Sequence, residues 1–497
     1  MSTIRQQSII SSGIVYIGFA LGFINTLIYA RALNPDQYGL IGIFFALGNI
    51  IYAFANMGMP AYVTKFYPYY RDRMPVKKID LMGWAFVLTV AGFIIVTIAS
   101  VIFRDAVIRK FSEKSSQFVI YYYWILPFGF GLTFYTLLEN LAWQLRASVL
   151  TNFLREFLWR IFVFGLILLY ISGIMTDFGL FIKIYSFTYI LLAAVLLVYL
   201  LKTGQLYFSF SVSVVTKKFF RKIRSLVLLA WTGTLMFNVS FFFAQVVIAA
   251  VVPGGLTAVA IFTLAQFIGS LVQAPQRGIA AAAIAPLSQA WKDKDYGRID
   301  RIYRRSSINL LLFSVAMFIL VWINFTDGVI FLHLKKDYLD ARPVFLFIGI
   351  ARLVDMGTGV NTQIIGTSSF WRFDFFSGMI LVSLTIPLNY VLAKNIGVTG
   401  PAIADLVTFA IYNGIRWLFL YRKFGMQPFT IKTLYTLLLG LAGYLICDRL
   451  FGHYSGFGWM VARSTLFILI FGTGALALRL SEDILLVWRT IRKRLGG

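Results

Sequence analysis

Apolar runs of about 20 residues recur along nearly the whole chain, and short polar stretches separate them. Each run is long enough to cross the hydrocarbon core of a bilayer as an α-helix, which needs about 20 residues. The pattern therefore predicts an all-α polytopic membrane protein with about 14 transmembrane helices. The expected helices lie at residues 8–31, 38–60, 79–103, 118–140, 152–172, 178–201, 226–252, 255–277, 306–326, 343–366, 373–394, 398–421, 431–451 and 457–479.

Two stretches of the chain resemble each other at a fixed separation. Each has a turn proline ahead of an apolar helix, and these prolines, Pro35 and Pro253, are 218 positions apart. The same offset separates Ile43–Phe44 from Ile261–Phe262. An apolar chain with two similar halves is typical of transporters, although unrelated hydrophobic hairpins also look alike. We therefore predict two pseudo-symmetric lobes of six helices each, followed by a terminal helix pair.

The repeat divides the chain into four parts. We predict an N-lobe at residues 1–204, a basic inter-lobe loop at 205–225, a C-lobe at 226–424, and two last helices with a basic cytoplasmic tail at 425–497. Within the inter-lobe loop, Lys217–Lys222 reads K-K-F-F-R-K. A basic amphipathic segment of this kind is expected to lie on the inner membrane surface.

The charge of the chain follows its membrane topology. Charged residues make up 13% of the sequence, against about 25% in a soluble protein. The net charge of +25 suggests nucleic-acid binding at first, but the basic residues gather in alternate loops, which is the positive-inside pattern. This pattern places both termini in the cytoplasm, and we expect no nucleic-acid partner.

Several kinds of catalytic site are missing from the sequence. One cysteine, Cys447, and two histidines, His333 and His453, leave little for a zinc or haem site or for a Ser/His/Asp arrangement. No G-x-x-x-x-G-K-[ST] phosphate loop is present, which argues against ATP-driven transport by this chain alone. We therefore expect a protein that is not an enzyme, with no metal and no cofactor other than H⁺ or Na⁺ as a coupling ion.

Polar residues recur at helical spacing within the predicted spans. In lipid such side chains are costly unless they face protein or water. The eighth span has the clearest stripe, spaced four, three and four residues and hence on one face: Gln266, Ser270, Gln273 and Arg277. Further candidates lie in the first, second and seventh spans: Asn25, Asn49, Asn56, Asn238 and Gln245. We predict a polar cleft between the lobes; the alternative is interhelical hydrogen bonding with small-residue packing.

Ionisable residues inside the spans are the second group of candidates. Arg352 and Asp355 lie three apart in the tenth span, Asp405 in the twelfth and Glu139 in the fourth. The guanidinium of Arg352 or of Arg277 can hold a diphosphate through its fork of donors. The three carboxylates can take up a proton or coordinate Na⁺. The structural alternative is that Arg352 and Asp355 neutralise each other.

Two motifs resemble a known family. The segment at residues 31–44 looks like the opening hairpin of bacterial polysaccharide-export flippases of the O-antigen and capsule type; it reads R-A-L-N-P-D-Q-Y-G-L-I-G-I-F. These belong to the multidrug/oligosaccharidyl-lipid/polysaccharide exporter superfamily. The segment at residues 395–405, which enters the twelfth span, reads N-I-G-V-T-G-P-A-I-A-D. It is similar to the G-x-x-G-x-A-x-A segment that is common at this place in the family. Drug exporters and lipid II flippases share the architecture, but the first span lacks the arginine or aspartate that they usually carry.

The resemblance implies a mechanism and a cargo. It implies two six-helix lobes in a V shape that work by alternating access. The implied cargo is a polyprenyl-diphosphate-linked oligosaccharide, which is a repeat unit of O-antigen (lipopolysaccharide), capsule or exopolysaccharide. The implied location is the bacterial cytoplasmic (inner) membrane. Such families typically line the cleft with cations, and Arg277 and Arg352 suit this role. The expected partners are this lipid, membrane lipids, and a polysaccharide polymerase with other assembly proteins, around a monomer. The alternatives are a cation-coupled multidrug antiporter, a lipid II flippase, a membrane-embedded glycan polymerase or transferase, and a scaffold without transport activity.

Overall fold

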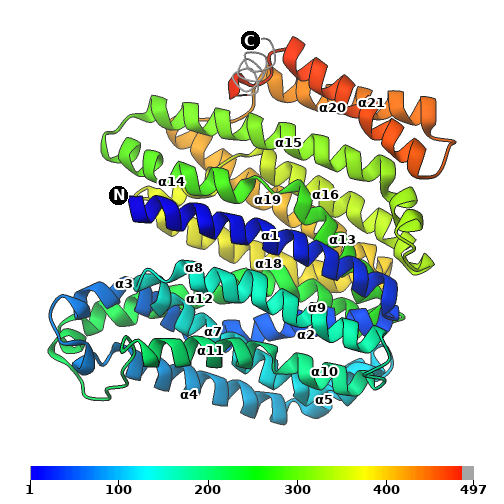
Figure 1. Cartoon of the computed structure of the whole chain (residues 1–497). Coiled ribbons are helices and arrows are strands. Elements are labelled where there is room, and N and C mark those ends of the chain that lie inside the picture. Colours follow the sequence, from blue (N-terminus) through cyan, green and yellow to red (C-terminus); the bar gives the residue numbers. More distant parts are fainter. Residues whose placement is uncertain (1, 484–497) are drawn as a thin grey trace. The chain divides into compact units, whose positions relative to one another are not determined.

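A computed structural model describes residues 2–483 of the protein, with the side chains of residues 13–15, 17–370 and 372–483 (Figure 1). Within these residues every regular element is helical. The basic tail predicted after the last helix, at 489–494, lies outside the described residues. The all-α class predicted from the apolar runs is confirmed.

The chain divides into two compact units, residues 1–260 and 261–497. The division falls within α13 (Gly255–Val272). Unit 1 contains α1 (Ser2–Ala32), α2 (Pro35–Ala55), α3 (Met59–Arg71), η1 (Val76–Lys78), α4 (Leu81–Ile102), α5 (Arg104–Phe111), α6 (Ser116–Ile120), η2 (Tyr122–Trp124), α7 (Ile125–Gln144), α8 (Ser148–Asn152), η3 (Phe153–Leu158), α9 (Trp159–Ile171), α10 (Phe178–Ser186), α11 (Thr188–Lys202) and α12 (Val214–Val251).

Unit 2 ends in the terminal helix pair that the sequence predicts. Its elements after α13 are α14 (Gln276–Lys292), α15 (Tyr296–Phe331), η4 (Lys336–Asp340), α16 (Ala341–Gly357), α17 (Asn361–Thr367), α18 (Trp371–Ile396), α19 (Thr399–Phe424), α20 (Ile431–Phe451) and α21 (Phe457–Ala477). The lobe boundaries proposed from the repeat, at residues 204 and 225, stay a prediction.

Within residues 2–483, twelve helices are long and apolar enough to cross a membrane, and a bent pair formed by Lys336–Gly357 and Asn361–Thr367 would be the thirteenth. The predicted span at 152–172 is not among them. There α8, η3 and α9 form one unbroken helical run, whose middle is a π-helix. Three charged residues, Arg155, Glu156 and Arg160, lie within it, so this helix is less apolar than the others.

Two helices extend well beyond the predicted spans. Helices α12 and α15 begin at Val214 and Tyr296, inside segments that were predicted as polar loops. Both have a capping side chain: Ser213 Oγ accepts from Thr216 N at 3.2 Å, and Asp295 Oδ1 accepts from Arg298 N at 2.9 Å. Such caps satisfy backbone donors at the start of a helix, and here they let both helices begin before their hydrophobic runs.

Glycines bring the central helices of unit 1 close together. A Cβ atom on Gly131 of α7 would overlap the backbone N of Ile190 on α11, and one on Gly48 of α2 would overlap the ring of Phe128. Phe128 is fully buried and stacks on Tyr185, with ring centroids 5.4 Å apart. Small residues at helix contacts are the usual means of close packing in a membrane, and here they place α2 and α7 in the middle of unit 1.

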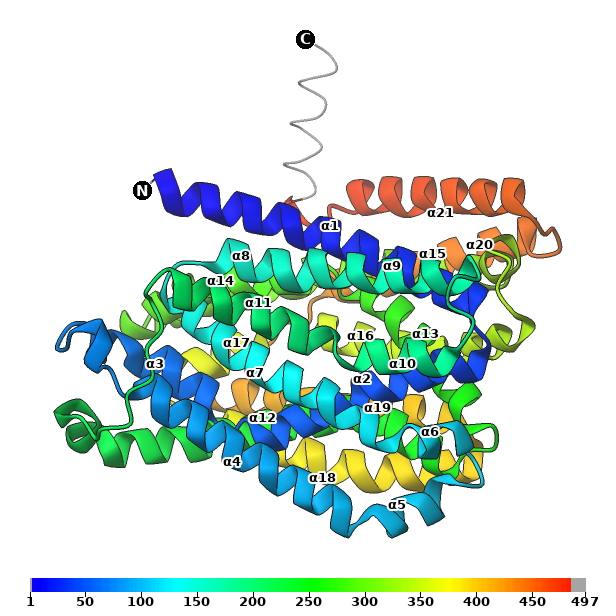
Figure 2. The same cartoon turned by 60° about the horizontal axis from the view of Figure 1, so that its bottom comes forward.

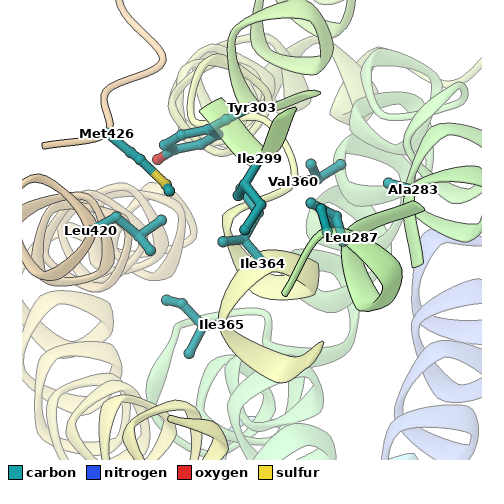
Figure 3. Packing of buried hydrophobic residues seen from close by; sticks show 10 residues of the cluster. Ala283, Leu287, Ile299, Tyr303, Val360, Ile364, Ile365, Leu420 and Met426 are labelled. Atoms are coloured by element: carbon teal, nitrogen blue, oxygen red, sulfur yellow. The ribbon is translucent and has the colours of Figure 1, made fainter. Parts of the chain in front are cut away.

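A hydrophobic cluster holds one end of unit 2 together (Figure 3). The cluster joins α14, the start of α15, α17 and the end of α19. Trp291 beside it donates from Nε1 to the carbonyl oxygen of Ile364 at 3.0 Å. The cluster thereby fixes α17, the short second arm of the bent pair. Its buried members are Ala283, Leu287, Ala290, Ile299, Tyr303, Val360, Ile364, Ile365, Leu420 and Met426.

The terminal pair is attached to α15. Helices α20 and α21 lie side by side in both views (Figures 1 and 2). Arg463 on α21 forms an ion pair with Asp327 on α15, and each side chain is 8% exposed. The backbone N of Gly456, just before α21, donates to Asp327 Oδ1 at 3.3 Å. One buried carboxylate therefore anchors both the helix and the turn that precedes it.

Candidate functional site

The break between α16 and α17 is lined by many polar side chains of unit 2. The two helices differ in direction by 48°, and Gly359 in the connection has φ +61°, a left-handed conformation that suits glycine. Side chains of α15 satisfy the interrupted backbone: Ser306 Oγ accepts from Val360 N at 3.3 Å, and Ser307 Oγ donates to the carbonyl of Gly357 at 2.5 Å. Broken helices of this kind form binding sites in transporters.

Asp355, on the last turn of α16, is surrounded by side-chain amides. Gln273 and Gln276 donate from Nε2 to its Oδ2 at 3.3 and 3.0 Å. Asn413 on α19 donates from Nδ2 to its Oδ1 at 3.1 Å. Hydrogen bonds to an ionised carboxylate are stronger than neutral ones, so this shell stabilises a negative charge inside the helix bundle.

The amide shell continues into a longer network. Oδ1 of Asn413 accepts from Thr358 Oγ1 and from Asn361 Nδ2, both at 2.9 Å. Thr362 Oγ1 then donates to Asn361 Oδ1 at 3.2 Å. Asn413 therefore connects the carboxylate on α16 with the first turn of α17.

The far end of this chain is a buried arginine. Arg416 is 1% exposed, and it bonds to Thr362 and forms an ion pair with Asp374. Its Nε donates to Ser377 Oγ at 3.2 Å, and its guanidinium carbon lies 4.0 Å from the ring centroid of Tyr412. We call the connected set the break network: Gln273, Gln276, Asp355, Thr358, Asn361, Thr362, Asp374, Ser377, Asn413 and Arg416.

Arg352 lies one turn before Asp355 but outside the break network. It is 5% exposed, its guanidinium carbon is 5.2 Å from the ring centroid of Phe409, and its Nε has no hydrogen-bond partner. Its charge acts on the carboxylate of Asp405, which α19 places nearby. Among the ion pairs of the described residues none joins Arg352 to Asp355. The two residues thus have separate surroundings, and Arg352 has an unused buried donor.

The predicted stripe of the eighth span does not lie on one helix. Helix α13 ends at Val272, and α14 starts at Gln276. Pro275 explains the interruption, because proline lacks the backbone donor and disfavours a helical residue before it. Gln266 and Ser270 remain on α13, where Ser270 Oγ donates to the carbonyl of Phe267 at 2.6 Å. Gln273 joins the break network, and Arg277 is exposed in the first turn of α14.

Most predicted polar residues of unit 1 have local partners. Asn49 and Asn238 donate to the carbonyl four residues earlier, at 2.8 and 2.9 Å. Asn56 closes α2, since its Nδ2 donates to the carbonyls of Tyr52 and Ala53 and its Oδ1 accepts from Gly58 N. These bonds are typical of amides within or at the end of a helix. Gln245 on α12 is 3% exposed.

Glu139 belongs to a charged cluster at the π-helix. Arg155 Nη1 donates to Glu139 Oε2 at 3.2 Å, and the carboxylate is 1% exposed. One turn later Arg160 pairs with Glu156 at 2.7 Å. Asn25 of α1 donates to the carbonyl of Arg160 at 2.9 Å. π-Helical segments occur frequently at functional sites, so this cluster is the second candidate region, beside the break network.

Sequence reasoning missed several of these residues, although signals for some were present. Arg155, Glu156 and Arg160 lie inside a predicted span, at 152–172. Asn413 and Arg416 lie three apart on a predicted helix, at 398–421, and thus share one face. Gln276 and Asn361 had no comparable pattern. The predicted cleft between the lobes stays a prediction.

No family model matches the chain, and no curated protein matches it. Solved structures are similar. The lipid II flippase MurJ in an inward closed conformation has a TM-score of 0.74 and 13% identity, and the match covers 95% of this chain and 99% of that one. An inward-facing multidrug resistance MATE family transporter of the MOP superfamily has a TM-score of 0.65 and 15% identity, over 84% and 98%. A MOP superfamily transporter from Pyrococcus furiosus has a TM-score of 0.56 and 15% identity, and the match covers 85% of this chain and 96% of that one.

These likenesses concern the fold, because the identities are only 13 to 15%. They confirm the predicted all-helical fold. The O-antigen branch, the cargo and the coupling ion stay predictions.

Proposed function

We propose that the protein is a flippase that moves polyprenyl-diphosphate-linked oligosaccharide from the inner to the outer leaflet of a bacterial cytoplasmic membrane. The observation that carries this proposal is Arg352, a buried cation with an unpartnered Nε. A buried donor without a partner is costly, and a phosphate oxygen satisfies a guanidinium in a fork geometry. The fold of a solved lipid II flippase over 95% of the chain supports the same class of transport.

The break network is proposed to couple transport to an ion. Asp355 receives three amide donors, and an amide that rotates presents its carbonyl oxygen in place of its nitrogen. Na⁺ or a proton on Asp355 or Asp405 would then change the charge beside Arg352, and so its affinity for diphosphate. Glu139 is proposed as a third ion site, in competition with its bond to Arg155.

Arg277 is proposed as a second contact for the diphosphate. Its exposure at the start of α14 suits a first encounter with the headgroup, whereas Arg352 is buried. The lipid tail stays in the bilayer during alternating access.

A cation-coupled multidrug antiporter is the second candidate. It is favoured by the fold likeness to a multidrug resistance MATE family transporter and by the half-buried carboxylate of Asp355 with its shell of amides. In that function a cationic drug would displace the coupling cation from the carboxylate, and Arg352 would not contact the cargo. A lipid II flippase is the third candidate, since the fold likeness to MurJ also supports it.

The test uses inverted membrane vesicles that contain the full-length protein. Protection of a radiolabelled polyprenyl-diphosphate oligosaccharide from an added glycosidase measures flipping, and ethidium accumulation measures drug transport. We expect flipping without ethidium transport. The Arg352→Gln variant should lower flipping by roughly 10- to 100-fold, since a hydrogen bond to a charged group contributes about 1.5–3 kcal/mol.

Two further variants sharpen the result. Arg352→Lys keeps the charge but loses the fork, so it should recover part of the rate. Arg342→Gln is the matched control, because Arg342 lies on the same helix but is exposed and rests on the ring of Trp322. Wild-type flipping by Arg352→Gln would remove the proposed role, and ethidium transport without flipping would establish the antiporter.

A further inference from the structure

Hydrogen bonds connect the first turn of α12 with α3 and with the loop that follows α3. The contacting residues Tyr70 and Thr216 are 146 positions apart in the chain. Thr216 Oγ1 lies 2.7 Å from the hydroxyl of Tyr70 and donates to Asp80 Oδ2 at 2.7 Å. The backbone N of Ser213 donates to the same carboxylate oxygen at 2.8 Å. In both views α3 and the start of α12 lie at the same end of unit 1 (Figures 1 and 2).

Phe219 lies at the centre of this contact. Its ring centroid is 5.9 Å from that of Phe66 and 5.2 Å from that of Tyr69. Arg73 from the α3 side and Lys222 from the α12 side approach the same ring, at 5.6 and 5.9 Å from its centroid. Two basic segments that are separate in the sequence therefore form one surface.

The charge of this surface is almost entirely positive. Asp72 is its exposed acidic residue, and Asp80 is buried and holds α12. Apolar side chains lie exposed beside the cations, with Phe210 and Phe220 each 57% and Val214 79% exposed. We call this surface the basic face, and its exposed cations are Lys65, Arg71, Arg73, Lys77, Lys78, Lys217, Lys218, Arg221, Lys222 and Arg224.

We propose that the basic face is a binding site for the phosphate headgroups of anionic phospholipids in the membrane that holds the protein. Helix α12 continues from this face as a candidate membrane span, so its first turns lie near the lipid headgroups. Cations interleaved with exposed aromatic and aliphatic side chains match a membrane interface, where the charges meet phosphates and the apolar groups enter the acyl boundary. An acidic protein or a nucleic acid would match the charges and leave Phe210, Val214 and Phe220 in water.

The site is separate from the proposed transport site and does not depend on the proposed function. A local reporter tests it in the full-length protein. Ser225 is exposed on α12 beside the face, and the native cysteine, Cys447, is buried, so a Ser225→Cys variant can carry one fluorophore. The protein is placed in phosphatidylcholine nanodiscs that contain a small fraction of nitroxide-headgroup phosphatidylglycerol or nitroxide-headgroup phosphatidylcholine.

We expect the anionic quencher to act several-fold more strongly than the zwitterionic one. The preference should fall between 0.1 and 1 M salt, because the Debye length shortens from about 10 Å to about 3 Å. Lys217→Gln/Lys218→Gln/Lys222→Gln should bring the quenching ratio close to one, since each basic residue near an anionic surface contributes about fivefold in affinity.

Two controls accompany the variant. Lys217→Arg/Lys218→Arg/Lys222→Arg changes the same positions but keeps the charge, so the preference should persist. Lys292→Gln/Lys294→Gln/Arg298→Gln removes three exposed charges near α15 and should leave the ratio at Ser225→Cys unchanged. Thermal unfolding confirms that each variant is folded.

Three results would overturn the proposal. Equal quenching by the two lipids in the labelled Ser225→Cys protein with its native lysines would show that the face does not select anionic headgroups. Loss of the preference in the Lys→Arg variant would show that charge is not its cause. Abolition of the preference by inorganic diphosphate at constant ionic strength would assign the face to a soluble or cargo diphosphate instead.

Discussion

Asn413 donates a hydrogen bond from Nδ2 to Oδ1 of Asp355 at 3.1 Å, across 58 positions of sequence. The same amide accepts two hydrogen bonds on its oxygen, from Thr358 and Asn361. One side chain therefore holds the carboxylate on α16, the connection and the start of α17.

Replacing Asn413 by leucine should lower the free energy of unfolding by about 2–5 kcal/mol, because buried donors and an acceptor lose their partners at about 1–3 kcal/mol each. Asn389→Leu is the matched control: Asn389 is fully buried, and its Nδ2 donates only within its own helix, to the carbonyl of Thr385 at 2.8 Å. Chemical denaturation of both purified variants measures the difference. Equal losses would mean that the network adds nothing beyond local helix bonds.

Asp355→Asn should remove the response of transport to an imposed ion gradient while the protein still inserts and folds. The neutral amide has the shape of the carboxylate but cannot bind a cation or proton with the same strength. Asp337→Asn is the control, because Asp337 is an exposed residue of η4 and its replacement removes the same charge away from the site. The measurement is the initial transport rate in vesicles with and without a Na⁺ or H⁺ gradient. An unchanged gradient response in Asp355→Asn would exclude this residue as the coupling site.

Breaking the ion pair between Asp327 and Arg463 should release the terminal helix pair. Both side chains are 8% exposed, and removing one partner of a buried pair costs about 3–5 kcal/mol because the other charge is left unpaired. Arg463→Met should therefore unfold earlier on heating and expose residues 452–456 to protease. The double variant Asp327→Leu/Arg463→Met should recover most of the loss. If the double variant were as unstable as the single one, the cost would lie in packing and not in the unpaired charge.

Gly131→Ala should destabilise unit 1 by roughly 1–3 kcal/mol, because its methyl group would overlap the backbone of α11. Gly165→Ala is the control in a neighbouring helix, since its Cβ would meet nothing within 4 Å. There alanine should be neutral or stabilise by up to about 1 kcal/mol through helix propensity. Thermal unfolding of the two variants in detergent compares them. A Gly131→Ala protein as stable as wild type would show that α7 and α11 can move apart without cost.

Much of the fold can be predicted from the sequence, for a physical reason. Backbone donors and acceptors cannot remain unpaired in lipid, so an apolar run of bilayer length becomes a helix. In the described part of the chain, twelve helices and one bent pair meet this condition, and a further helical run at 148–171 covers the remaining predicted span except its last residue. The exceptions have local causes. Pro275 ended the eighth helix early, and the caps Ser213 and Asp295 started two helices before their apolar runs.

The candidate site was only partly predictable. Arg352, Asp355, Asp405 and Gln273 stand out in the sequence because charged and amide residues are rare within apolar runs. The residues that contact them do not stand out in the same way. The proximity of Arg352 and Asp355 in the sequence suggested an ion pair. Instead, Asp355 accepts from amides in the turn between α13 and α14, on α14 and on α19, and Arg352 lies against the ring of Phe409.

The sequence by itself determined that the chain crosses the membrane many times as helices, and which rare polar residues lie inside the spans. The tertiary structure alone decided which of them meet: Asp355 with Asn413, Arg155 with Glu139, and the basic turns of α12 with those of α3. Helical periodicity tells which residues share a face, but not which neighbouring helix that face meets. In a membrane that choice depends on small-residue packing and interhelical hydrogen bonds, which join residues from distant parts of the chain.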